Sequence, residues 1–135
     1  MIARTIIMVA ITTSLTACAG LYDTPDELRA QGKYKISATI EAEHVMLYTE
    51  VIKQMRYCFD RGSFRVTNDN FGSTSVIFVG FYYVLYHPKI TYVIDMKAVE
   101  TKTEVVVTGV NEKITEGMVE GMKLFAAGKP DQMCE

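Results

Sequence analysis

Residues 76 to 86 carry apolar or aromatic side chains at every position except Gly80. Successive side chains of a β-strand point to opposite faces of the sheet, so this strand would place apolar groups on both faces. A sheet with helices on one side normally shows polar residues to water on the other. We therefore expect a central strand whose second face is either shielded by neighbouring structure or used for binding.

The binding alternative defines a candidate surface. Large exposed apolar patches usually mark contact sites, and Tyr keeps a polar tip in water while its ring is covered. Gly80, in mid-strand, fits a bulge or bend that would curve the sheet around a helix. The candidate surface residues are Phe78, Phe81, Tyr82, Tyr83, Tyr86 and Tyr92.

Two segments have the three- and four-residue spacing of amphipathic helices. The first, residues 41–59, has a stripe of Val45, Tyr48, Ile52, Met55 and Phe59. The second, about 112–127, has a stripe of Ile114, Met118, Met122 and Phe125. A third and shorter helix is expected near 25–31, because Thr24 to Glu27 form a capping box with Pro25 at the first helical position. That helix either packs through Leu28 or stays loosely solvated.

The other patterned segments read as strands. Residues 34–40 alternate cleanly between apolar and polar positions, which indicates a half-buried strand. Residues 64–67, 74–86, 90–97 and 103–110 follow, joined by turns at 68–73, 87–89 and 100–102, and predict an antiparallel meander. The fold class is therefore α+β, with a curved antiparallel sheet of about four to five strands and two helices on one face. This order is similar to that of helix-grip folds.

The N-terminus has the three parts of an export signal. Arg4 supplies a positive start, an apolar run follows, and Leu15-Thr16-Ala17-Cys18 ends it. The run is about half of the roughly 20 residues that a membrane-spanning helix needs. The last four residues resemble the lipobox of bacterial lipoproteins at all four positions. An ordinary signal peptide, cleaved near Ala17 or Ala19, is the alternative.

The resemblance implies a lipid anchor in the bacterial cell envelope. In that family the signal, here residues 1–17, is removed and Cys18 carries the acyl chains, including palmitate. Residues 18–33 would then be a lipidated tether and 34–135 a single domain. Ala19 stands where an Asp retains many such proteins at the inner membrane, so the family rule favours the outer membrane, facing the periplasm.

Charge and motifs exclude several function classes. The signal contains one of the 14 basic residues and none of the 16 acidic ones, which leaves 13 against 16, or −3, on the mature chain. No basic patch for nucleic acid is present. His44 and His87 have no zinc-ligand spacing around them, and Ser63, Ser73 and Ser75 are in no nucleophile motif. We therefore expect no metal, no cofactor and no catalytic residue.

Two kinds of function fit these observations. The first is a lipoprotein, not an enzyme, that contacts the membrane through its lipid and a protein partner through its domain, as an adaptor, assembly or surface protein. The second is a carrier or sensor of an apolar ligand held between the sheet and the long helix. The direction of Phe78, Tyr82 and Tyr86 would separate the two, because the first needs them exposed and the second needs a hollow.

If Cys18 is lipidated, Cys58 and Cys134 remain, and an even number of cysteines in an exported protein favours one disulfide. The bond would close a loop of 77 residues and would stabilise the fold by roughly 4–5 kcal/mol in the chain-entropy model. We expect the unreduced mature protein to take up no alkyl group at these two residues, as measured by intact mass. Uptake of two alkyl groups by an unreduced monomer would show free thiols, and a dimer that dissociates on reduction would show a bond between chains.

Overall fold

The helices and strands follow one another in the order that the sequence pattern predicts. The computed structural model describes residues 22–58, 64–70, 73–84 and 87–129. In chain order the elements are α1 (Pro25–Gln31), β1 (Tyr34–Ile40), α2 (His44–Cys58), β2 (Phe64–Asn70), β3 (Thr74–Val84), β4 (His87–Val99), β5 (Lys102–Gly109) and α3 (Glu112–Ala126).

The strands form one five-stranded antiparallel sheet in the order β1-β5-β4-β3-β2. Strands β2 to β5 are a meander, and β1 adds to β5 over the register Tyr34↔Gly109 to Ile40↔Thr103. The central strand is therefore β4, which corrects the expectation for residues 76–86, because β3 lies between β4 and the edge strand β2. The pairing of β3 with β4 shifts on both sides of Gly80, which confirms a bulge there.

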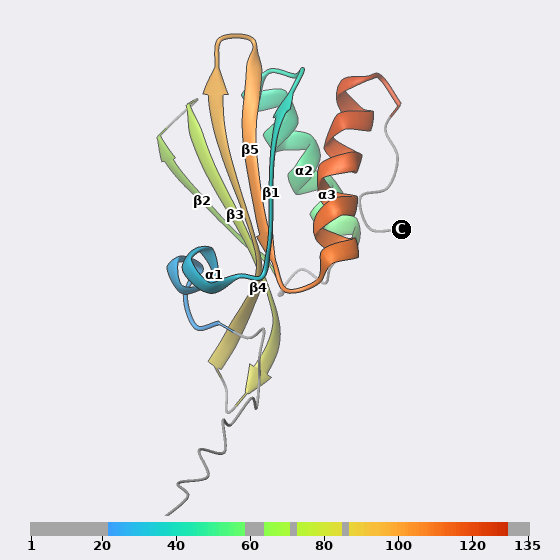
Figure 1. Cartoon of the computed structure of the whole chain (residues 1–135). Helices are drawn as coiled ribbons and strands as arrows, with labels where there is room; N and C mark the ends of the chain where they lie inside the picture. Colours follow the sequence, from blue (N-terminus) through green and yellow to red (C-terminus); the bar gives the residue numbers. More distant parts are fainter. Residues whose placement is uncertain (1–21, 59–63, 71–72, 85–86, 130–135) are drawn as a thin grey trace, which may run out of the picture.

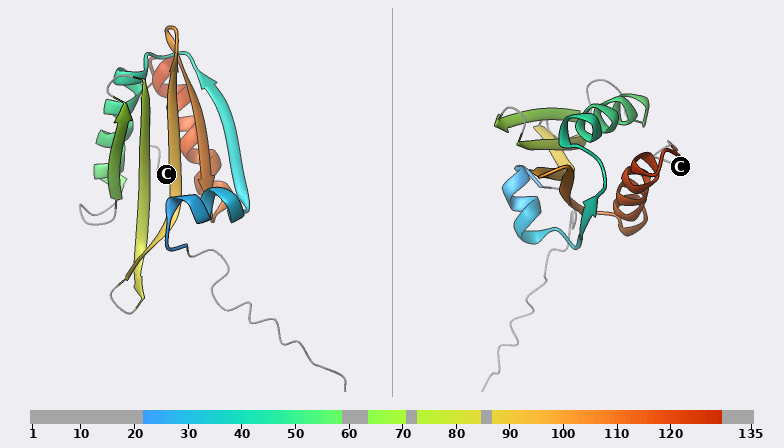
Figure 2. Two further views of the ribbon diagram at one scale, coloured as in Figure 1. Left: turned by 90° about the vertical axis from the view of Figure 1, so that its left-hand side faces the viewer. Right: turned by 90° about the horizontal axis from the view of Figure 1, so that it is seen from above.

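Helices lie on both faces of the sheet. Helices α2 and α3 cover one face, as predicted, and α1 lies against the other, over β4 and β5 (Figures 1 and 2). The predicted α+β class with two helices on one face is confirmed. The short first helix is a packed element of the fold, since Leu28 is fully buried.

The main core fills the space between the sheet and the pair α2 and α3. The inward positions of β1 contribute to this core, as the alternation predicts. The buried apolar side chains of the core are at most 2 % exposed. They come from all three layers of this half: Leu47, Val51 and Met55 of α2, Ile77, Val79, Tyr92, Ile94, Met96, Val105 and Val107 of the sheet, Ile40 at the end of β1, and Met118, Val119 and Met122 of α3.

Both long helices bury a slightly different stripe from the predicted one. Helix α2 begins at His44 and buries His44, Leu47, Val51 and Met55, while Val45 is half exposed. Helix α3 buries Thr115, Met118, Val119 and Met122, while Ile114 is exposed. Neighbouring apolar residues allow two overlapping stripes on one helix, and contact with the sheet selects between them.

Two predicted turns are parts of strands. β2 continues to Asn70, which pairs with Thr74, and β4 begins at His87, which pairs with Val84. Cross-strand pairing here overrides the local turn preference of Asn and Pro. Pro88 is tolerated because β5 pairs with β4 only from Tyr92 onward, which leaves one side of β4 without a neighbouring strand near Pro88.

Candidate functional site: the sheet face that α1 covers

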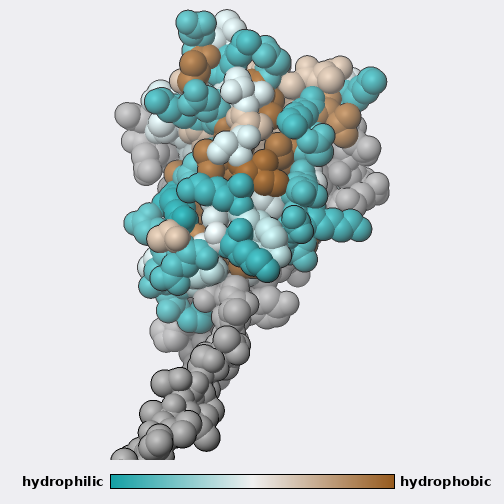
Figure 3. Space-filling model, in the orientation of Figure 1, coloured by the Kyte–Doolittle hydropathy of each residue, from teal (hydrophilic) through white to brown (hydrophobic). Residues whose placement is uncertain are grey.

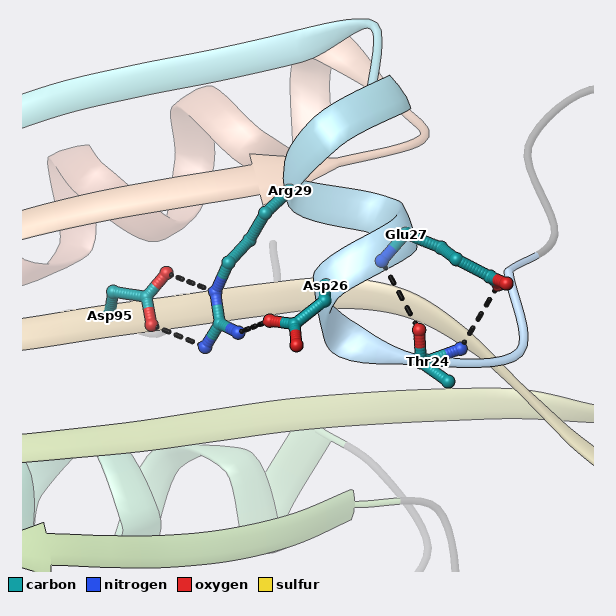
Figure 4. Close-up of polar contacts among 5 residues, drawn as sticks. All are labelled: Thr24, Asp26, Glu27, Arg29 and Asp95. Carbon is teal, nitrogen blue, oxygen red and sulfur yellow. Dashed lines mark hydrogen bonds and ion pairs between the residues drawn. The ribbon is translucent and has the colours of Figure 1, made fainter.

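Helix α1 is fixed at its start by reciprocal capping. The Thr24 hydroxyl accepts a hydrogen bond from the backbone N–H of Glu27 at 3.2 Å, and the Glu27 carboxylate accepts from the backbone N–H groups of Thr24 at 3.3 Å and Asp23 at 2.9 Å. Figure 4 shows the two reciprocal bonds that join Thr24 and Glu27. The predicted capping box is therefore formed. It satisfies backbone donors that a helix of seven residues would otherwise leave unpaired.

Leu28 attaches the helix to the sheet. Its side chain is 0 % exposed and packs with Ile90 and Val93 of β4 in a second, smaller core on this face. At the end of the helix, a Cβ on Gly32 would collide with Thr108 of β5 and with the carbonyl oxygen of Leu28. Only glycine permits the backbone to approach β5 this closely.

A guanidinium fork adds a polar connection beside Leu28. The Nε and Nη2 groups of Arg29 donate to the two carboxylate oxygens of Asp95 at 2.9 and 2.7 Å, and Nη1 donates to Asp26 at 2.6 Å (Figure 4). The Arg29 and Asp95 side chains are each about 30 % exposed. The hydrogen bond with Asp95 is the main factor that raises the pKa of Arg29 above its ordinary value, so Arg29 keeps its positive charge in this pair.

The chain before the helix is also bonded to the sheet. The backbone N–H of Ile90 donates to the Tyr22 carbonyl at 2.7 Å, in an isolated antiparallel bridge. The Tyr22 hydroxyl donates to the Gln31 carbonyl at 3.1 Å, and Lys89 forms an ion pair with Asp23. The predicted tether is thus integrated with the sheet from Tyr22 onward.

Sequence reasoning missed Arg29 and Asp95 as partners. A signal was present, because Asp95 is the only charged residue between Lys89 and Lys97. An acid among apolar neighbours in a strand favours a cation on the same face. Sequence spacing could not identify the partner, since Arg29 lies 66 residues earlier in the chain.

The structure describes the side chains of only some residues of the predicted binding surface. Tyr92 is 2 % exposed and belongs to the main core, so its assignment to a surface rim is wrong. Its ring lies where a Cβ on Gly109 would be, which explains its burial beside the neighbouring strand. Phe78, Phe81, Tyr82 and Tyr83 belong to β3 by their backbone, with side chains outside the described part of the structure, and Tyr86 lies outside the described residues.

Polar and apolar side chains both line the uncovered part of the face beside α1, among them Ala38, Val76 and Val106. Two open grooves of about 390 and 270 Å³ run along it, and they share Glu104 and Val106. The other side chains along them include Ser37, Thr39, Thr74 and Lys97. Among the coloured residues of Figure 3, hydrophobic groups form small patches between hydrophilic ones. Among the described residues, α1 covers Ile90 and Val93 of this face and leaves both grooves open.

On the other face the fold brings together two residues that the sequence did not connect. The Nε2 atom of His44 and the Oγ atom of Ser75 share a hydrogen bond of 2.8 Å between α2 and β3. The residues are 4 % and 1 % exposed, and Nδ1 of His44 is buried without a hydrogen-bond partner. A nucleophilic serine needs access to substrate and an oriented base. This pair has neither, so we assign it to holding α2 on the sheet.

The remaining candidate residues are dispersed. Ser63 and Cys134 lie outside the described residues, Ser73 is exposed, His87 is the first residue of β4, and Cys58 is the last of α2. The disulfide therefore stays a prediction. Within residues 22–58, 64–70, 73–84 and 87–129, no group of three metal-ligating side chains comes together. No helix in these ranges has the length and apolar character needed to cross a membrane.

Comparisons with known proteins add little. No protein-family model matches the sequence, and no curated protein matches it. Among solved structures, it is similar to a TBP-like protein from Parabacteroides distasonis, with 13 % sequence identity and a TM-score of 0.35 over 70 % of this chain and 81 % of that one. A similarity at this level supports no inference about function.

The docking of α1 can be tested by truncating Leu28. We expect Leu28→Ala to weaken docking by about 2–5 kcal/mol, because a buried leucine loses its contacts and leaves a cavity. Since 1.4 kcal/mol corresponds to a factor of ten, hydrogen exchange of the α1 amides should accelerate more than tenfold. Arg29→Lys, which keeps the charge and removes the fork, should have a smaller effect. Lys35→Ala, on an exposed side chain of β1, is the control, and unchanged exchange in Leu28→Ala would show that α1 is not held by this contact.

The buried pair can be tested in the same way. Ser75→Ala should lower the free energy of unfolding by about 1–3 kcal/mol, because it leaves His44 without its partner in a buried site. Replacing both residues by apolar ones, Ser75→Ala with His44→Leu, should cost less than the sum of the single changes. Ser73→Ala, two residues away and exposed, should change stability by less than about 0.5 kcal/mol. Urea unfolding measures all four variants, and full additivity would contradict the pairing.

Proposed function

We propose that this protein is a lipoprotein of the bacterial cell envelope that acts by contact with another protein. One observation carries the proposal. The lipobox ends at Cys18, only four residues before Tyr22, where the chain is bonded to β4. Acylation at Cys18 would therefore hold the folded domain directly at the membrane, with almost no free tether. Two or more acyl chains provide stable anchoring, and Ala19 favours the outer membrane by the rule of the family.

The outer face of α2 is the contact surface that we propose. Met46 and Tyr57 are 59 % and 78 % exposed. They lie three turns apart, so they share one side of the helix, with Lys53 between them. Met, Tyr and Arg are enriched in protein interfaces, and Arg56 lies beside Tyr57. This surface faces away from the sheet.

A carrier function is supported less well by the described residues. It needs space between the sheet and α2, and that layer holds Leu47, Val51 and Met55 packed at 0 % exposure against Ile77 and Ile94. Close-packed side chains of this kind leave no room for a ligand unless the helix moves. We therefore propose only the contact function.

The anchor is tested by Cys18→Ser in the full chain expressed in its own cell type. We expect the variant to move from the membrane fraction to the soluble fraction and to lose incorporation of a labelled fatty acid. Ser14→Ala is the matched control, since it changes the residue just before the lipobox and leaves all four lipobox positions and both other cysteines intact. A Cys18→Ser protein that stayed membrane-bound and labelled would refute lipidation at this residue.

The contact surface is tested by a photo-crosslinking amino acid at Met46 or at Tyr57 in intact cells. Both positions should give the same protein adduct, identified by mass spectrometry. The same probe at Lys113, an exposed residue of α3, should not give it. Adducts that are equal at all three positions, or absent from Met46 and Tyr57, would contradict a specific surface on α2.

A further inference from the structure

The N-terminal segment joins the sheet near one end of its longest hairpin. Tyr22 bonds to Ile90, the fourth residue of β4, and Asp23 forms its ion pair with Lys89, the third residue of β4. The paired ends of β3 and β4 project beyond α1 and beyond the rest of the sheet (Figures 1 and 2). The point where the chain enters the fold is thus fixed beside this projecting end.

Chain length limits where the anchor can lie. Cys18 lies four residues before Tyr22, and an extended chain spans at most about 3.6 Å per residue, or about 14 Å in all. Along β4, His87 is about 10 Å from Ile90, whereas Val99 is about 30 Å away in the opposite direction. Cys18 can therefore lie level with the hairpin end, and it cannot lie level with the turn between β4 and β5.

The residues at the two ends differ in the way that a membrane surface requires. The last pairs of the hairpin are Tyr82↔Lys89, Tyr83↔Pro88 and Val84↔His87. Tyr is enriched at the membrane–water interface, and Lys places its apolar stem in the interface and its charge in water. At the other end, the turn consists of Glu100 and Thr101, both exposed, between Val99 and Lys102. Only the hairpin end has the aromatic composition of an interfacial segment.

We propose that the paired ends of β3 and β4, residues 82–84 and 87–89, form the membrane-facing end of the domain and rest in the lipid–water interface of the membrane that holds the anchor. This inference depends on the proposed lipidation of Cys18. The anchor sets the distance, the bonds of Tyr22 and Asp23 set the orientation, and the tyrosines supply the affinity. The outer face of α2 then stays accessible from the periplasm.

The sequence contains no tryptophan, so a single introduced one is a clean reporter. The full chain, acylated in cells and purified, is placed in vesicles of phosphatidylethanolamine and phosphatidylglycerol with or without brominated acyl chains, which quench tryptophan in the bilayer. We expect brominated lipid to reduce the fluorescence of Tyr83→Trp at least twofold. Val99→Trp, at the opposite end of β4 and 37 % exposed in the natural protein, should be unchanged.

Each other outcome has a defined meaning. Equal quenching at both ends would show a domain lying flat, and no quenching at either end would show a hairpin held off the membrane; both overturn the inference. Tyr82→Trp provides a second reporter should Tyr83→Trp fail to fold, as judged by urea unfolding. The mass of acylated Cys18 is verified first, so a protein without acyl chains counts against the proposed function and is distinguished from a failure of the orientation.

Discussion

The whole arrangement depends on the docking of α1 through Leu28, assisted by the fork between Arg29 and Asp95. A sheet whose central strands carry apolar residues on both faces requires a cover on each side. Helices α2 and α3 supply one cover, and a helix of only seven residues supplies the other. So short a helix would be marginal alone. It is stabilised here because the capping box, the buried leucine and the ion pair act on the same turns.

With Cys18 acylated as we propose, this docking would also link the fold to the membrane. The segment that covers the second face follows the residues that resemble a lipobox, so one stretch of chain completes the smaller core and would limit the distance to the proposed anchor. The bond between Ile90 and Tyr22 transmits that limit to β4. A domain attached in this way has a preferred orientation, whereas a long flexible tether would allow any. Orientation matters for a protein that acts by contact, because it decides which face a partner can reach.

Two polar pairs that join helices to the sheet illustrate different uses of polar groups. Arg29 and Asp95 are partly exposed and share two hydrogen bonds, which suits an element added to the surface of the sheet. His44 and Ser75 lie within the main core and join its helix layer to β3. A buried hydrogen bond of this kind specifies which helix face packs on the strand, because a rotated helix would leave both groups unpaired.

The sequence alone determined the α+β class, the order of the elements and the capping box at Thr24, because these depend on local periodicity and on residues within one turn of each other. The resemblance of residues 15–18 to a lipobox is also visible in the sequence alone, because such a signal is linear. Tertiary structure alone decided that Tyr92 is core, that Val45 and Ile114 face outward, and that β4 is central, because each depends on which strand or helix lies alongside. Pairs such as Arg29 with Asp95 and His44 with Ser75 are separated by 66 and 31 residues. No local pattern records such a pairing, since only the register of the strands brings the partners within hydrogen-bonding distance.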